Sequence, residues 1–180
     1  MPDVNARTRP PVHPLPNQQD IIDEIGLSTV FSSLDIKAGF HNIPVAPDSQ
    51  QYCGIITQDG VWCYTRMAFG FLAAPAAFQA VIEWIIDQMS KQLGRKLQAR
   101  VYIDDTFPHG IAVSSVWEDT KRVIQAYVEA GLLINLSKCM FLVADVVALG
   151  FALANREYRL GNKAITKLLS AQIPRNLKEL

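Results

Sequence analysis

Neither sign of charge is in excess in this sequence, because 17 lysine and arginine residues balance 17 aspartate and glutamate residues. The chain therefore lacks the basic surplus with which a free-standing nucleic-acid-binding protein neutralises phosphates. Cysteine is also scarce: Cys53, Cys63 and Cys139 are odd in number and have no close paired spacing. This argues against a disulfide framework and a zinc site, and favours reduced thiols inside the cell.

Long apolar runs are missing too. No segment approaches the ~18 apolar residues of a membrane span, and the first twenty residues hold five prolines instead of the apolar core of a secretion signal. We therefore expect a soluble, cytoplasmic protein with no membrane partner. With 49% hydrophobic and 19% charged residues, the 180-residue chain suits one globular domain with a sizeable core.

The prolines at the start of the chain predict an extended leader over residues 1–16, because proline fixes φ and lacks a backbone donor. They stand at positions 2, 10, 11, 14 and 16. Asn17 then suits the N-cap of a short helix that Gly26 ends. Later helices are expected from Pro75 to Leu93, from a Ser114 or Ser115 cap to Gly131, and from Asn162 onward.

Strands are interspersed with these helices. We expect them over 30–36, 52–57, 61–65, 97–103, 107–113 and 132–135, with a hairpin over 140–154. Pro108 weakens the strand over 107–113, since it removes one donor. This order favours an α+β fold in which helices cover one face of an antiparallel sheet.

Three acidic residues stand at the ends of apolar strands. Asp104 and Asp105 follow one strand, and Asp35 ends another. A solvated hairpin turn is the plain interpretation of the pair, and a helix N-cap is that of Asp35. If the two strands are neighbours, the carboxylates converge into an oxygen site of the kind that holds Mg²⁺ and performs phosphoryl transfer.

Five segments, in this order, resemble the motifs of the reverse transcriptase family, particularly gypsy-type LTR retrotransposons. FSSLDIKAGFHNI at 31–43 resembles motif A, MAFGFLAAPAAFQ at 67–79 motif B, YIDD at 102–105 motif C, AGLLINLSKC at 130–139 motif D, and Leu149-Gly150 the primer-grip turn. Residues 4–8 and 13–16 resemble the segment that leads from the fingers into the palm. The resemblance covers nearly the whole chain.

The resemblance implies a polymerase palm with part of the fingers. Residues 1–29 would be the leader and short helix, 30–154 the palm core, and 155–180 the start of the thumb-side connection. The implied activity is RNA-directed DNA polymerisation by two Mg²⁺ or Mn²⁺ ions within a retrotransposon polyprotein. The implied partners are an RNA or DNA template with primer, deoxynucleoside triphosphates and the rest of the polyprotein, and the implied location extends to virus-like particles.

Site roles also follow from the resemblance. Asp35 and Asp104 would bind both metals, Asp105 would support them, and Lys138 would protonate the leaving pyrophosphate. Phe40 would act as a steric gate against a 2′-hydroxyl. The other nucleotide-binding residues would be Phe69, Gly70, Gln79 and Tyr102. From the residues alone, Phe40 is as well explained as a core aromatic and Lys138 as a surface lysine.

Departures from the family pattern leave a second hypothesis open. Ala68, Leu72, Ala73 and Ala77 replace the more usual proline, threonine, asparagine and threonine, and Asn42 stands where glutamine is common. The basic fingers hairpin and the thumb are also expected to be absent from this chain. The alternative is therefore a catalytically inactive palm remnant that binds nucleic acid or protein. A third, weaker hypothesis is an unrelated α+β metal-binding domain.

Overall fold

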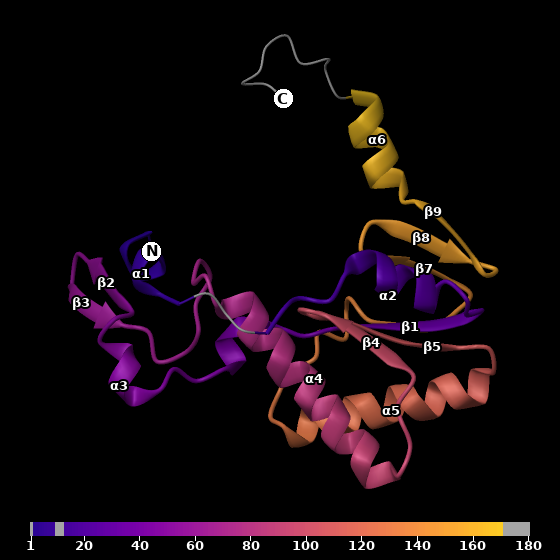
Figure 1. Cartoon of the computed structure of the whole chain (residues 1–180), viewed down its shortest axis with the longest axis horizontal. Coiled ribbons are helices and arrows are strands. Elements are labelled where there is room, and N and C mark those ends of the chain that lie inside the picture. Colours follow the sequence, from indigo (N-terminus) through magenta and orange to yellow (C-terminus); the bar gives the residue numbers. More distant parts are fainter. Residues whose placement is uncertain (1, 10–12, 171–180) are drawn as a thin grey trace.

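The computed structural model describes residues 2–9 and 13–170. Pro10, Pro11 and the last ten residues of the expected thumb-side connection lie outside the described residues. Figure 1 shows a larger part, built on a sheet with helices, and a smaller part that contains the N-terminal helix and a short hairpin. The long helix α4 (Ala74–Leu93) begins where the two parts meet.

The larger part is organised by a four-stranded sheet with the order β4-β5-β1-β6. Its strands are β1 (Val30–Asp35), β4 (Ala99–Tyr102), β5 (Asp105–Gly110) and β6 (Met140–Val143). All three pairings are antiparallel. The β4-β5 pair is the expected hairpin around the acidic residues, and β1 lies beside β5 although 70 residues separate Asp35 from Asp105 in the sequence.

Pro108 lies inside β5 and opposite Ala99 of β4. The amide of the next residue, His109, donates to Gln98 on the β4 side, so by strand alternation the donor that Pro108 lacks would have faced β1. The ladder between β1 and β5 is interrupted at that point, between the pairs Phe31↔His109 and Leu34↔Thr106. The sequence therefore predicted the weak point correctly, but the strand continues through it.

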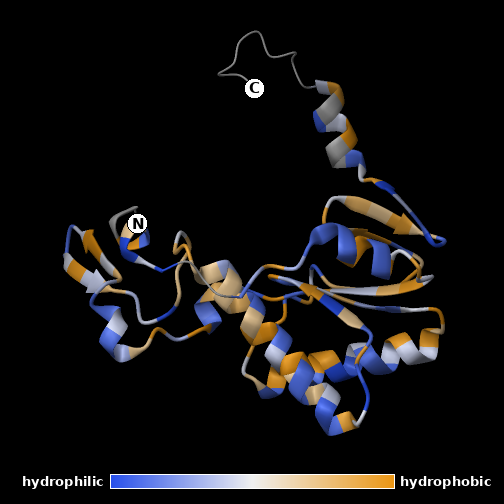
Figure 2. Ribbon diagram, in the orientation of Figure 1, coloured by the Kyte–Doolittle hydropathy of each residue, from blue (hydrophilic) through white to orange (hydrophobic). Residues whose placement is uncertain are grey.

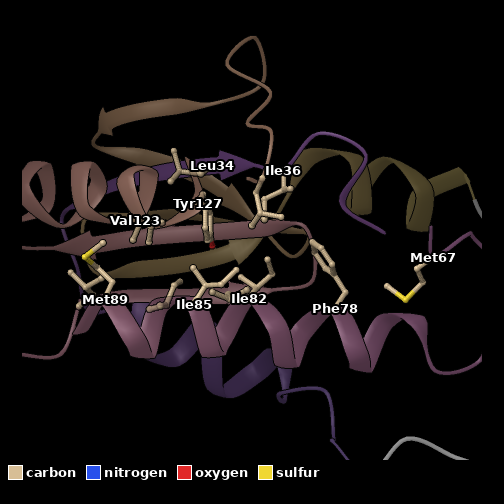
Figure 3. Close-up of a cluster of buried hydrophobic side chains, with 14 of the residues drawn as sticks. Leu34, Ile36, Met67, Phe78, Ile82, Ile85, Met89, Val123 and Tyr127 are labelled. Carbon is tan, nitrogen blue, oxygen red and sulfur yellow. The ribbon is translucent and has the colours of Figure 1, made fainter. Parts of the chain in front are cut away.

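Two helices cover one face of this sheet and enclose the main core. They are α4 and α5 (Val113–Glu129), which contribute Phe78, Ile82 and Tyr127 to a cluster with Leu34 of β1. Figure 3 shows these side chains between the helices and the strands. Each of the four is fully buried, and each buried apolar side chain of this size stabilises the fold by about 1.5–3 kcal/mol.

The opposite face is covered as well, which differs from the expectation of helices on one face alone. There α2 (Gln18–Ile25) and a three-stranded sheet, β7 (Asp145–Ala148), β8 (Phe151–Ala154) and β9 (Glu157–Leu160), enclose a second cluster around Ile22, Phe31 and Phe107. β1 carries a fully buried apolar side chain on each face, Leu34 on one and Phe31 on the other, so both faces need cover. The antiparallel α+β architecture itself is confirmed.

The smaller part is held by few buried side chains. It contains α1 (Pro2–Arg7), α3 (Pro47–Gln50) and the hairpin of β2 (Gly54–Thr57) with β3 (Gly60–Cys63). Strands were expected here over 52–57 and 61–65. Ile56 and Val61 face each other across the hairpin and are 87% and 74% exposed. Figure 2 shows hydrophobic colouring on these uncovered strands.

Several local predictions were wrong. The leader is helical as α1, because Pro2 occupies its first position, where a missing donor costs nothing. Ser114 and Ser115 do not cap α5, whose N-cap is Ala112. Residues 132–135 form a single bridge, Ile134 to Ile36, instead of a strand.

The expected hairpin over 140–154 is divided. Its first strand, β6, pairs with β1, and the hairpin consists of β7 and β8, to which the unexpected β9 is added. The final helix begins as predicted and is α6 (Asn162–Ser170). No helix within the described ranges is long and apolar enough to cross a bilayer.

Candidate functional site

The sheet brings the three acidic residues together. Asp35 is the direct cross-strand partner of Asp105, and directly opposed residues point to the same face of a sheet. The amide of Ile36 donates to the carbonyl of Asp104 at 3.1 Å, which places the Asp104 backbone beside that of Asp35. The convergence expected from two strand ends is therefore present in the backbone.

Asp104 occupies the two-residue turn between β4 and β5, since Tyr102 pairs with Asp105. Ile103 in this turn has a φ of 52°, an unusual value for a β-branched residue. The Oδ1 atom of Asp104 is buried without a hydrogen-bond partner, and it points at Gly39. A Cβ atom at position 39 would collide with this oxygen and lie 2.8 Å from Cζ of Phe78, so glycine is required there.

Burial raises the pKa of both Asp104 and Asp105, and the negative charge of Asp35 raises the pKa of each further. Lys138 acts in the opposite direction on both carboxyl groups. Its Nζ atom lies 3.2 Å from Oδ2 of Asp35. The acidic residues thus repel one another in a partly buried place where one lysine supplies a positive charge.

The chemistry of these donors fits a hard divalent cation. All are carboxylate oxygens, one of them is buried and unpartnered, and a cation would relieve the repulsion that raises the pKa values. With the side chains as they stand, no group of three or more His, Cys, Asp or Glu residues in the described ranges is arranged around one ion position. Lys138 instead contacts Asp35, so metal binding at this site would require these side chains to turn.

Phe40 lies close to the acids, in the single turn of 3₁₀-helix η1 (Gly39–Asn42). Its ring meets the ring of Phe69 edge-on, with centroids 5.3 Å apart, and that of Phe78 at 5.6 Å. Phe40 is half-buried against the main core. Phe40 therefore packs as a core aromatic, and its role as a steric gate stays a prediction.

The side chain of Asn42 stabilises the 3₁₀ turn η1 by hydrogen bonds to the preceding backbone. Its Nδ2 atom lies within 3.1–3.3 Å of the carbonyls of Lys37, Ala38 and Gly39. Ala38 has a φ of 51°, so the chain before the turn adopts a left-handed conformation that few residues other than glycine favour. Asn42 and Gly39 were not predicted as site residues, and the signal that could have found Gly39 is its place one residue before the aromatic.

Phe69 and Gly70 form an exposed turn beside Phe40. Phe69 is 65% exposed despite its contact with Phe40. Gly70 has a φ of 90° and no heavy atom within 4 Å of where a Cβ would be. The expected close approach of a ligand to this backbone has the space that it needs.

Gln79 is placed differently from the expectation of a nucleotide contact. It is fully buried, and its Nε2 donates to Val101 O at 3.0 Å and to Glu83 Oε1 at 2.7 Å. Its Oε1 accepts from the amide of Ile103 at 2.6 Å. Gln79 therefore binds the turn that carries Asp104, and its side chain does not face the site.

Tyr102 stands two residues before Asp104, but Asp104 belongs to the turn, so strand alternation does not relate the two side chains. Tyr102 is instead the cross-strand partner of Asp105 and packs against the second cluster, on the α2 side of the sheet.

The three acids are partly buried, and two depressions of the described surface lie away from them. These depressions of about 690 and 570 Å³ are lined by other residues, the first by α1, α3 and their neighbours, the second by the β4 edge and α4. Neither includes an acid of the site.

Comparison with known proteins identifies the family. The family described as reverse transcriptase (RNA-dependent DNA polymerase) matches residues 3–174. The Transposon Tf2-3 polyprotein of Schizosaccharomyces pombe is 29% identical over 177 residues, which are 98% of this chain and 13% of that polyprotein. The chain thus spans about an eighth of the length of this relative.

Two solved structures share the fold over 98% of the chain at 26% identity. The foamy viral protease-reverse transcriptase dRH in complex with double-stranded DNA has a TM-score of 0.84, and this chain covers 30% of it. The foamy viral protease-reverse transcriptase in complex with an RNA/DNA hybrid has a TM-score of 0.82, with 23% covered. Because the family match spans nearly the whole chain, this protein belongs to the reverse transcriptase family.

Proposed function

We propose that this chain is the catalytic palm of an RNA-directed DNA polymerase and works as part of a gypsy-type retrotransposon polyprotein. The observation that carries the proposal is the pairing of Asp35 with Asp105 beside the turn that holds Asp104. The similarity to a transposon polyprotein supports the wider context. The division into leader and short helix (1–29), palm core (30–154) and the start of the thumb-side connection (155–180) is part of the same proposal.

In the proposed reaction the primer 3′-oxygen forms a bond to the α-phosphorus of a deoxynucleoside triphosphate, and the bond to pyrophosphate breaks. Two Mg²⁺ or Mn²⁺ ions would supply the positive charge that activates the attacking oxygen and stabilises the leaving one. Asp35 and Asp104 would hold them, with Asp105 in support. Lys138, whose Nζ lies 3.2 Å from Oδ2 of Asp35, would pass a proton to the departing pyrophosphate.

Two aromatic residues would shape the nucleotide position. The ring of Phe40 would exclude a 2′-hydroxyl by steric contact and so favour deoxynucleotides. Phe69 and Gly70 offer exposed backbone and ring surface to the base pair. Tyr102, opposite Asp105, would also belong to the nucleotide-binding residues.

The proposed partners are a template with primer and deoxynucleoside triphosphates. The foamy viral relatives were solved with double-stranded DNA and with an RNA/DNA hybrid, which supports nucleic acid as the partner. We place the protein in the cytoplasm, within virus-like particles. No membrane partner is part of the proposal.

An inactive palm that binds nucleic acid or protein is the second candidate. It is favoured by Ala73 and Ala77, which supply no side-chain polar group at the start of α4, beside the Phe69 turn. The intact acids favour the first candidate.

Primer extension on an RNA template tests the function. The chain alone is expected to extend the primer weakly or not at all. A longer protein that adds the flanking segments of its relatives is expected to extend the primer with Mg²⁺ or Mn²⁺. The reason is that this chemistry depends on holding the triphosphate and the duplex. Salt is kept low, since phosphate contacts weaken steeply as salt rises. Asp104→Asn in the longer protein should abolish synthesis.

Two results would refute parts of this proposal. An inactive longer protein would favour the inactive palm. Full activity of the Asp104→Asn variant would overturn the assignment of the acids. In an active longer protein, Phe40→Ala is expected to increase ribonucleotide incorporation, and unchanged incorporation would remove the steric-gate role.

A further inference from the structure

The side chain of Asn5 makes two hydrogen bonds to the turn of residues Phe69–Leu72, which follows motif B's first residues. Its Nδ2 donates to the carbonyl of Gly70 at 2.8 Å, and its Oδ1 accepts from the amide of Leu72 at 2.9 Å. More than 60 residues separate the partners in sequence. The asparagine amide carries its donor and its acceptor on separate atoms, so it can bind a carbonyl and an amide of the same turn at once.

Within this turn Phe71 packs against the main core, whereas its neighbours are more exposed. Phe69 and Leu72 are 65% and 48% exposed, so burial contributes little to their positions. Gly70 has a φ of 90°. Because glycine has no Cβ, its backbone can adopt many other conformations and does not hold the turn by itself. Backbone hydrogen bonds are made at the two ends of the turn, by the amide of Met67 to the carbonyl of Ile43 and by the amide of Ala74 to the carbonyl of Phe71. These bonds do not use the Gly70 carbonyl or the Leu72 amide, which bind Asn5 instead.

The position of Phe69 matters because it forms a ring cluster with the turn at Phe40. Phe69 meets Phe40 at 5.3 Å and His41 at 5.4 Å, edge-on in both cases. Phe40 in turn meets Phe78, whose ring lies against Gly39 and close to the Asp104 carboxylate. Asn5 is thus linked through one turn to the aromatic surface next to the acids.

We propose that Asn5 is a positioning residue, which holds the Phe69–Leu72 turn and thereby keeps the Phe69 ring against Phe40. Its importance for nucleotide use rests on the proposed function. The N-terminal helix α1, although short and exposed, would thus stabilise this turn through Asn5. The substituent that matters is the amide, because a carboxylate could accept from Leu72 but could not donate to Gly70.

The test compares Asn5→Asp and Asn5→Ala with Thr8→Val in the 180-residue chain by NMR. Thr8→Val is the matched control, since it removes a hydrogen bond within the same part of the chain, from Thr8 Oγ1 to Val4 O, without touching the turn. Both Asn5 variants should lose the ring-to-ring cross-peaks between Phe69 and Phe40. In Asn5→Ala the Leu72 amide should also exchange about tenfold faster, the effect of one lost hydrogen bond. Thr8→Val should change neither.

Unchanged cross-peaks and exchange in both Asn5 variants would overturn the proposal, and so would equal changes in Thr8→Val. The consequence for nucleotide use is measured as primer extension by the longer protein. Asn5→Asp is expected to raise the KM for deoxynucleotides about tenfold with little change in kcat, because a displaced ring weakens binding more than chemistry. If the unmodified longer protein is inactive, the proposed function fails while the NMR result still decides whether Asn5 positions the turn.

Discussion

At the scale of single residues, Gln79 shows how a buried amide can hold the turn that carries Asp104. Its side chain satisfies Val101 O and the Ile103 amide on either side of residue 102, next to Asp104. The helical spacing of the sequence placed Gln79 correctly on α4, whose apolar stripe repeats every turn. Its burial was not predicted, because a polar residue enters a core when partners that are distant in sequence satisfy it.

Replacing Gln79 by methionine is expected to destabilise the protein. The shape is similar, but the Ile103 amide and the Val101 carbonyl lose their buried partner, which lowers the free energy of unfolding by about 2–4 kcal/mol. Urea denaturation measures this. Gln92→Met, at an exposed position on the same helix, should stay within about 0.5 kcal/mol of the unmodified chain. Equal effects in both variants would mean that the Gln79 amide is not held as described.

His109 makes stability depend on pH. It is buried, its Nδ1 lies 2.9 Å from Ser28 Oγ, and its Nε2 has no hydrogen-bond partner and lies 4.0 Å from Glu24. Burial lowers the pKa of His109 below 6.5, aided by Arg100 and Lys96, whereas Glu24 and Asp119 act in the opposite direction. Below pH 6.5 the unfolded chain therefore binds a proton that the folded chain resists.

The free energy of unfolding should consequently fall as the pH is lowered from above 6.5 towards the depressed pKa of His109. His109→Gln cannot take up this proton, so its stability should depend less steeply on pH in that window. Thermal denaturation at a series of pH values measures the difference. His41→Gln, at an exposed position, is the matched control. A variant that keeps the original slope would show that His109 does not cause it.

At the scale of elements, local signals predicted some segments and long-range pairing decided others. The helix between Asn17 and Gly26 was confirmed together with its cap, because the Asn17 side chain bonds the Gln19 amide within two residues. Residues 132–135 look like a strand but form one bridge, since β6 takes the place beside β1. The local sequence pattern does not determine which of two candidate strands pairs with the free side of β1.

The β2-β3 hairpin should be the element that opens most easily. A two-stranded hairpin without a covered face is marginal in water, and Ile56 and Val61 are largely exposed. By contrast, Leu34 and Thr106 pair in the middle of the main sheet and are fully buried. Amide exchange in the hairpin is therefore expected to be about 100-fold faster or more than at this central pair. Equal protection would show that the hairpin opens only when the whole chain unfolds.

At the scale of the whole molecule, charge is balanced overall and concentrated locally. The 17 basic and 17 acidic residues cancel, yet Asp35, Asp104 and Asp105 meet beside Lys138. The sequence predicted this meeting from two strand ends and the motif order. It could not predict the orientation of the side chains, which depends on Gly39 from one loop and Lys138 from another.

Paramagnetic broadening by Mn²⁺ tests most directly whether Asp35, Asp104 and Asp105 form one divalent-cation site. In the 180-residue chain, small amounts of Mn²⁺ are expected to broaden the amide signals of residues 35–36 and 103–106 before others, because these backbones lie together. Excess Mg²⁺ should reverse the effect, since both ions prefer carboxylate oxygens. Asp104→Asn should weaken it strongly, whereas Asp59→Asn in the turn of the exposed hairpin should not. Broadening that is spread evenly over exposed acids, or that is unchanged in Asp104→Asn, would contradict a shared metal site.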